Sequence, residues 1–390
     1  MADPAPDAAS ISWPEVCERR LTRQGLSVPL VGATPADVVT AMCGAHAQVM
    51  PAAELSVGLR LADGTRAAVS DALWTDRSLV KTYGPRGTVH LLPAVDLPIW
   101  HAALSAVPVP DFDRLLTADQ AMAVAEAIGT ALATAELTVD ELGDQVIAAT
   151  GLWAADPVMP AFGGMWPRWR KAIGYAAHRG LLCFGQARGR RVTYVNPRRW
   201  LPAYREFDEA TSVHELITRY LRTYGPASPA HFARWLGAPP RWAADRFESM
   251  AGALEPVLLD GEVLWQLAEE TWPAPAYPPP VDEGVRLLPY FDAYVVGSYP
   301  RELLFPGLAG RRALARGQAG NFPVLALDGC VAGLWHHRRS GTQVRITVEA
   351  FTRLTRSQRS ALSSQAERVG QVLGAEPQLT LGPVRIGPHA

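Results

Sequence analysis

The chain has little cysteine, almost no lysine and no excess of charge of either sign. Its four cysteines, Cys17, Cys43, Cys183 and Cys330, are far apart in the sequence. None of them forms a Cys-x-x-Cys pair or has a histidine at the spacing that zinc sites use. This pattern supports neither a disulfide framework nor a metal centre, so we expect no bound metal.

Long apolar runs are also missing. No stretch approaches the roughly 18 residues that a membrane-spanning helix needs, and the opening MADPAPDAAS is polar, unlike a secretory signal. With 390 residues, 48% of them hydrophobic, the chain is long enough for several domains with their own cores. We therefore expect a cytoplasmic protein that does not bind membranes.

A formal net charge of -1 does not indicate a nucleic-acid-binding protein, but local clusters matter more than totals. From residue 161 to residue 200 there are nine basic residues and no Asp or Glu. They are Arg168, Arg170, Lys171, Arg179, Arg188, Arg190, Arg191, Arg198 and Arg199. A solvated basic face is the ordinary explanation. The clustering favours contact with phosphates instead, first of all at Arg168, Arg170, Lys171, Arg188, Arg190 and Arg191.

The preference for arginine carries less weight than the clustering. Only Lys81 and Lys171 are lysines, and arginine binds phosphate in a bidentate fork. Genome base composition produces the same bias.

A group of helices followed by a β-hairpin is predicted three times along the chain. In the first copy, helices precede LVKTYGPRGTVHLLP, in which Gly84-Pro85 and Gly87 supply the turn. In the second, a helix over 162–180 precedes the strands LLCFGQ and RVTYVN. In the third, Asp260-Gly261 joins two strands in a hairpin. This order is typical of winged helices.

We therefore predict a mainly α fold with β-hairpin wings (α+β), built from three tandem winged-helix units and a small β-rich C-terminal domain. The units span 11–115, 116–205 and 206–272, and the C-terminal domain spans 283–390. The proline-rich TWPAPAYPPP is interpreted as a linker. In the C-terminal domain, LLPYFDAYVVG, FPVLALDGCVAGLWHH and TQVRITVEAF are predicted strands, followed by a helix near 358–373.

The segment ADVVTAMCGAHAQVMPAAELSVGLRL places His46 and Gln48 at the junction between two helices. At such a junction we expect both side chains to leave the core and face a partner. The ordinary alternative is a packed or capping histidine with no role in catalysis.

Several motifs together resemble the AlkZ-like DNA glycosylase family over about residues 11–348. They are RRLTRQGL, AHAQ, the following EL-x-VGLRL helix, KTYGPRGTVHLLPAVDL, RTYGPASPAHFARWLG and LLPYFDAYVVG. The resemblance implies a concave DNA-binding surface and a catalytic polar-x-polar pair, often Gln-x-Gln or Gln-x-Asp. The matching residues here are His46 and Gln48. The family's Asp-Pro-like turn after the pair is replaced by Val49, Met50 and Pro51.

The resemblance also implies an activity: hydrolysis of the N-glycosidic bond of bulky or crosslinked N7-alkylated purines, with self-resistance to a genotoxic natural product as its role. The expected partner is double-stranded DNA carrying such adducts, and the protein is expected to be a monomer without a cofactor. His46, with a pKa near neutral, would take a proton from water while Gln48 orients that water.

Other basic residues are candidates for DNA contact. Arg86 and His90 lie in the RGTVH segment, and Arg86 either meets DNA or braces its own turn. Arg311, Arg312 and Arg316 lie in a Gly-rich loop that either probes a groove or is mobile. A non-catalytic DNA-binding regulator is the alternative function.

Overall fold

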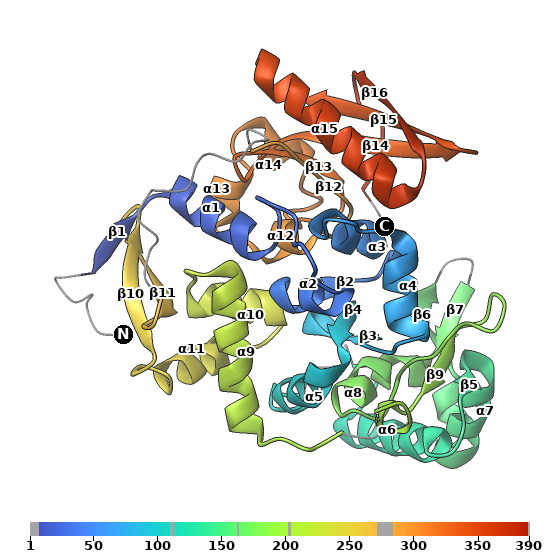
Figure 1. The fold of residues 1–390 in the computed structure, drawn as a ribbon. Coiled ribbons are helices and arrows are strands. Elements are labelled where there is room, and N and C mark those ends of the chain that lie inside the picture. Colours follow the sequence, from blue (N-terminus) through green and yellow to red (C-terminus); the bar gives the residue numbers. More distant parts are fainter. Residues whose placement is uncertain are drawn as a thin grey trace.

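The computed structural model describes residues 8–109, 112, 114–161, 164–201, 204–270 and 284–388. It is a mixed α and β fold in which helices surround several small sheets. We refer to 11–115, 116–205, 206–270 and 284–388 as the first, second, third and C-terminal regions. In Figure 1 the first region lies in the middle, the second and third lie below it on either side, and the C-terminal region lies above.

Among its described residues, the first region has five α-helices and a three-stranded sheet with the order β2-β4-β3. The helices are α1 (Trp13–Arg23), α2 (Pro35–Ala41), α3 (Met50–Arg60), α4 (Arg66–Trp74) and α5 (Leu97–Ser105). The strands are β2 (Ala45–His46), β3 (Leu79–Tyr83) and β4 (Val89–Pro93). Helix α2 begins at Pro35 because Thr34 caps it: the Thr34 hydroxyl accepts a hydrogen bond from the Asp37 N–H, and the Asp37 carboxylate accepts one from the Thr34 N–H.

The second region contains α6 (Ala118–Leu132), α7 (Val139–Thr150) and α8 (Ile173–His178). Its strands are β5 (Leu137–Thr138), β6 (Pro157–Ala161), β7 (Gly164–Pro167), β8 (Cys183–Phe184) and β9 (Thr193–Val195). The predicted pairing of LLCFGQ with RVTYVN is confirmed by β8 and β9.

The helix predicted over 162–180 is wrong in its first half, and Phe162 itself lies outside the described residues. Strand β7 pairs with β6, a 3-10 turn follows over Arg168–Ala172, and α-helix begins only at Ile173. Pro167 has no N–H to donate, so a helical ladder cannot run through it. Two tryptophans of this stretch therefore differ in burial: Trp169 is buried in the core, whereas Trp166 is 43% exposed.

The third region has α9 (Glu209–Tyr224), α10 (Pro229–Leu236) and α11 (Pro240–Glu248), followed by β10 (Leu254–Leu259) and β11 (Glu262–Leu267). The predicted hairpin is confirmed: Asp260 and Gly261 both have positive φ, as a tight hairpin turn requires. A strand that the sequence did not predict, β1 (Ala9–Ile11), pairs with β10 in parallel.

The C-terminal region has one sheet with the order β12-β13-β14-β15-β16. Its strands are β12 (Arg286–Leu288), β13 (Val324–Leu327), β14 (Cys330–Ser340), β15 (Gln343–Ala350) and β16 (Glu376–Leu381). Its helices are α12 (Ala293–Gly297), α13 (Arg301–Leu304), α14 (Leu308–Arg312) and α15 (Arg356–Leu373). The last of these confirms the predicted helix near 358–373.

The strand predicted over LLPYFDAYVVG is only partly correct. Strand β12 ends at Leu288, and α12 begins at Ala293, where Asp292 caps it by accepting a hydrogen bond from the Tyr294 N–H. An aspartate that caps a helix competes with continuation of the strand. The two elements are therefore joined by a short loop that contains Phe291.

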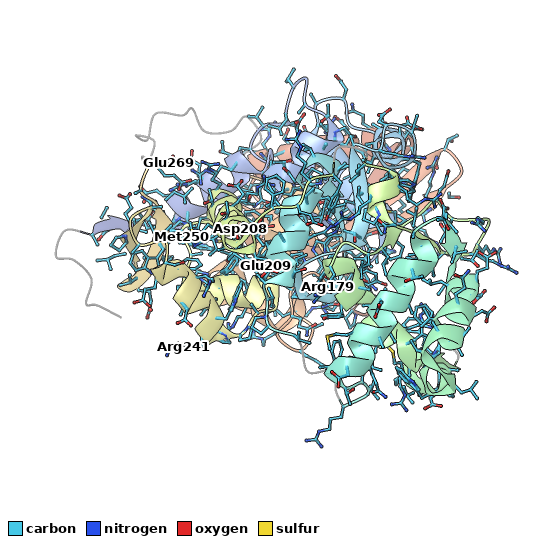
Figure 2. The ribbon with its side chains drawn as sticks, turned by 90° about the horizontal axis from the view of Figure 1, so that it is seen from below. Arg179, Asp208, Glu209, Arg241, Met250 and Glu269 are labelled. Atoms are coloured by element: carbon cyan, nitrogen blue, oxygen red, sulfur yellow. The ribbon has the colours of Figure 1, made fainter. Side chains whose placement is uncertain are left out.

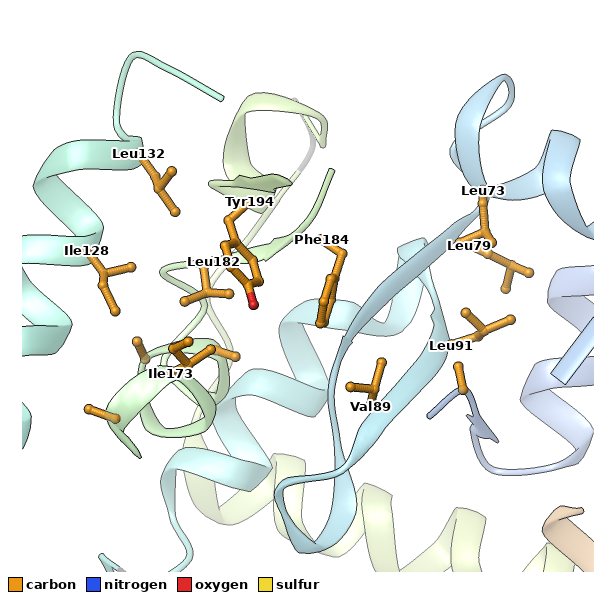
Figure 3. Packing of buried hydrophobic residues seen from close by; sticks show 14 of the residues in the cluster. Leu73, Leu79, Val89, Leu91, Ile128, Leu132, Ile173, Leu182, Phe184 and Tyr194 are labelled. Carbon is orange, nitrogen blue, oxygen red and sulfur yellow. The ribbon is translucent and has the colours of Figure 1, made fainter. Parts of the chain in front are cut away.

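The first and second regions share one core. Figure 3 shows Leu73, Leu79, Val89 and Leu91 on one side and Ile128, Leu132, Ile173, Leu182, Phe184 and Tyr194 on the other. Burying this apolar surface fixes the first sheet against the second region. The assignment of the regions to winged-helix units, and their boundaries as domains, remain predictions. The predicted linker at 271–280 lies outside the described residues. Among the helices in the described part of the chain, none has the length and apolar composition of a membrane span.

Candidate functional site

His46 lies in the short strand β2, directly after the chain has turned out of α2. The turn uses two residues with positive φ, Cys43 and Gly44, and a Cβ added to Gly44 would lie 3.1 Å from a methyl carbon of Leu92. Glycine is suited to this position because it has no side chain to place there. The register then pairs His46 with His90 of β4.

The His46 ring is enclosed by two other rings. It stacks on Phe291 with 4.6 Å between centroids and an interplanar angle of 17°, and it meets His90 edge-on at 5.1 Å. Only 9% of His46 is exposed. The expectation that this side chain leaves the core is therefore wrong, because Phe291, 245 residues away in the sequence, covers it.

This enclosure changes the acid-base chemistry of His46. Burial, and then the positive charge of Arg86, lower the pKa of His46 to about 3. The expected pKa near neutrality is therefore wrong. The imidazole is uncharged at neutral pH and has little tendency to keep a proton taken from water.

Gln48 is exposed and lies next to His46, as predicted. Between them Ala47 is buried and donates its N–H to the Val89 carbonyl at 2.7 Å. The Gln48 backbone N–H approaches His46 Nδ1 at 3.5 Å. In the neutral ring this contact favours a proton on Nε2.

Two further candidates, His90 and Arg86, make hydrogen bonds to backbone carbonyls. His90 is buried, and its Nδ1 lies 2.9 Å from the Thr88 carbonyl oxygen. His90 therefore packs against His46, and its contact with DNA stays a prediction. Arg86 has positive φ and donates to the Trp235 carbonyl of α10, a partner in the third region and not in its own turn. Its contact with DNA stays a prediction.

A buried ion pair holds Phe291 over His46. Asp292 accepts two hydrogen bonds of 2.8 Å from Arg60 of α3 and one of 2.6 Å from Ser56, and both charged side chains have no exposed surface. The C-terminal region is thus fastened to the first region one residue away from Phe291. Within the stretch LLPYFDAYVVG no local pattern indicates a role for Phe291 or Asp292, because their partners His46 and Arg60 are more than 200 residues away in the chain.

The basic segment at 161–200 is partly neutralised in space. Arg168 pairs with Asp156 at 2.9 Å, and Arg188 pairs with Glu141 at 3.2 Å and also donates to the Glu136 carbonyl. Both acidic residues lie before residue 161, so they are outside the segment that has no Asp or Glu of its own.

The remaining basic candidates are distributed between two regions. Arg190 and Arg191 are exposed at the turn before β9, and Arg170 lies over the Trp166 ring at 4.1 Å. In the C-terminal region Arg311 and Arg316 are exposed, whereas Arg312 pairs with Glu349 at 2.9 Å. DNA contact by these residues and by Lys171 stays a prediction. Viewed from below, Asp208, Glu209 and Glu269 are labelled on the same side of the molecule as Arg179 and Arg241, so that side carries both signs of charge (Figure 2).

Comparison with known proteins places these features in context. The model of a family described as DNA glycosylase AlkZ-like matches residues 39–372. The interstrand DNA cross-link repair glycosylase of Streptomyces sahachiroi is 31% identical over 340 residues, 83% of this chain and 87% of that protein. The solved structure of Streptomyces sahachiroi DNA glycosylase AlkZ matches with a TM-score of 0.78 and 27% identity, covering 96% of this chain and all of the other.

Proposed function

Because this chain belongs to the AlkZ-like DNA glycosylase family and is a DNA glycosylase, we propose that it hydrolyses the N-glycosidic bond of bulky or crosslinked N7-alkylated purines in duplex DNA. The relative named for interstrand cross-link repair supports the crosslinked class of substrate. The proposed role is protection of the producing cell from a genotoxic natural product. His46 and Gln48 are the proposed catalytic pair.

The single observation that carries the catalytic assignment is the placement of an exposed Gln48 beside an enclosed, uncharged His46. Two neutral polar groups at one spot can hold a water molecule by hydrogen bonds and direct their dipoles at charge that develops nearby. They form no ion pair with phosphate, and a simple DNA-binding protein has no use for them.

The substrate supplies most of the driving force. An N7-alkylated purine is already cationic, so the electrons of the breaking C1′–N9 bond neutralise the base as it leaves. The positive charge passes to the sugar, water bonds to C1′, and the proton of that water is released to solvent. No side chain has to protonate the leaving base.

The role of His46 is therefore to position the water and not to deprotonate it. Its pKa of about 3 makes it a poor base. A glutamine in the same position, as the resemblance to the family implies for many members, has no basicity. An imidazole and a carboxamide share a hydrogen-bond donor and an acceptor on a flat group, and both can lie against the Phe291 ring.

The direct test is incubation of the purified protein with a duplex that carries an N7-alkylguanine adduct, followed by detection of free base and abasic sites. We expect release from the adducted duplex and none from an otherwise identical unmodified duplex. Tight binding without release would instead favour the alternative of a DNA-binding regulator.

A further inference from the structure

Two of the four cysteines meet in the folded chain although they are 313 residues apart in the sequence. Cys17 lies on α1, and Cys330 is the first residue of β14. One helical turn before Cys17, the Trp13 indole N–H donates to Cys330 Sγ at 3.2 Å. A Cβ added to Gly329 would lie 2.5 Å from Cys17 Cβ and 2.9 Å from its sulfur, so α1 packs directly on the start of β14.

The environment of the two sulfurs is unequal. A hydrogen bond from the Cys17 thiol, together with the Trp13 N–H, lowers the pKa of Cys330 to about 7 in spite of its partial burial. The same hydrogen bond, together with burial, raises the pKa of Cys17. The lowered pKa favours the thiolate of Cys330 over that of the other three cysteines, and the thiolate is the form of cysteine that reacts with oxidants.

The other two cysteines provide an internal comparison. Cys43 and Cys183 are buried, and burial raises the pKa of both thiols. Cys330 alone of the four is not fully buried. Reactivity follows thiolate content and access, so both criteria select the same residue.

We propose that Cys330 is a site of oxidation by peroxides and that Cys17 converts the oxidised sulfur to a disulfide. The Cys330 thiolate attacks one oxygen of hydrogen peroxide, the O–O bond breaks, and the departing hydroxide takes a proton to become water. Cys330 is then a sulfenic acid. Cys17 loses its proton and attacks that sulfur, the S–S bond forms, the S–O bond breaks, and a second water leaves.

The bond would tie the first helix to the C-terminal sheet. Helix α1 already contacts two other regions, because Arg20 donates to the carbonyls of Tyr299 and Pro226 at 2.8 Å and 3.0 Å. Tyr294 of α12 donates to the Gly329 carbonyl at 2.9 Å, so the cysteine pair also adjoins the helix that follows Phe291. A covalent link here constrains the unfolded chain, and we expect the oxidised protein to have a higher Tm.

The test starts with reduced, native protein. It is treated with hydrogen peroxide in slight molar excess, the remaining thiols are alkylated, and the protein is digested without reduction for mass spectrometry. We expect one cross-linked peptide pair containing Cys17 and Cys330, with two hydrogen atoms lost, reversed by dithiothreitol. Cys43 and Cys183 should be recovered alkylated.

Variants separate the two roles. In Cys17→Ser, Cys330 should accumulate as a sulfenic acid that dimedone labels, whereas Cys330→Ser should give neither label nor cross-link. Cys183→Ala removes a buried thiol and should leave the cross-link intact. The proposal is overturned if native wild-type protein forms no Cys17–Cys330 link, or if Cys43 and Cys183 are oxidised as fast. This readout depends on thiol chemistry alone, so it is independent of the outcome for base excision.

Discussion

The buried ion pair between Arg60 and Asp292 gives the sharpest prediction about stability. Replacing Asp292 by Ala removes the acceptor of two Arg60 hydrogen bonds, of the Ser56 hydroxyl and of the Tyr294 N–H that begins α12. Because neither charged side chain has exposed surface, the Arg60 guanidinium would remain charged and unsolvated. Breaking one side of such a pair costs about 3 to 5 kcal/mol, a large part of a typical total of about 5 to 15 kcal/mol.

The assay is urea unfolding of Asp292→Ala and of the double variant Arg60→Met with Asp292→Ala. Removing the stranded charge should recover part of the loss, which gives a coupling free energy of roughly 1 to 3 kcal/mol in the double-mutant cycle. The control is Glu269→Ala, which breaks an exposed pair with Arg222 near the surface seen in Figure 2. It should cost less than about 1 kcal/mol.

Two results would refute this reasoning. One is a cost below about 1 kcal/mol for Asp292→Ala, which would mean that water reaches the site. The other is strict additivity in the cycle, which would mean that the two charges do not depend on each other. A stable variant that has nonetheless lost excision would show that the pair matters for the position of Phe291 more than for folding.

Three further predictions concern other parts of the chain. Burial lowers the pKa of His101 to about 3 in the folded chain, whereas an unfolded histidine has a pKa of about 6.5. As the pH falls below about 6.5, the unfolded chain therefore gains a proton that the folded chain does not, and the free energy of unfolding declines. His101→Asn keeps a hydrogen-bond partner for the Tyr204 hydroxyl but has no ionisable group. Between about pH 7 and pH 5 its unfolding free energy should therefore fall by about 2 kcal/mol less than that of the wild type. Gly237 has φ of +83°, and an added Cβ would lie 2.9 Å from neighbouring backbone, so Gly237→Ala should lower the unfolding free energy by more than about 1 kcal/mol in urea. Replacing Arg190 and Arg191 by Ala should weaken duplex binding and reduce the slope of log K against log salt by as much as about 1.8, and an unchanged slope would mean that this turn points away from DNA.

Features set by neighbouring residues were predictable from the sequence. The Asp260-Gly261 hairpin needs only the ability of those two residues to adopt positive φ. The proximity of His46 and Gln48 follows from their being only two residues apart in the chain. The helix predicted over 162–180 was wrong for an equally local reason: Gly164 begins strand β7 and Pro167 ends it, and Pro167 has no N–H for a helical hydrogen bond.

Features set by distant residues were not predictable. The enclosure of His46 depends on Phe291, whose place depends on a buried pair between Arg60 and Asp292. No pattern within either segment indicates that contact. The pKa expected for His46 was therefore that of a solvent-exposed imidazole, near neutral. The acidic partners of Arg168 and Arg188 likewise lie outside the basic segment 161–200.

The central claim is that His46 positions water as a neutral polar group. It is tested most directly by single-turnover excision of an N7-alkylguanine adduct by wild type, His46→Ala and His46→Gln, at saturating protein and across pH. We predict that His46→Ala slows excision by about 100- to 1,000-fold with nearly unchanged DNA affinity. His46→Gln should stay within about 10-fold of wild type, since it restores a hydrogen-bonding group without a basic nitrogen. The wild-type rate should show no ionisation between about pH 5 and pH 8, because the pKa of His46 is lowered to about 3. A His46→Gln variant as slow as His46→Ala, together with a wild-type rate that rises with pH through about 6.5, would contradict the account and restore His46 as a general base.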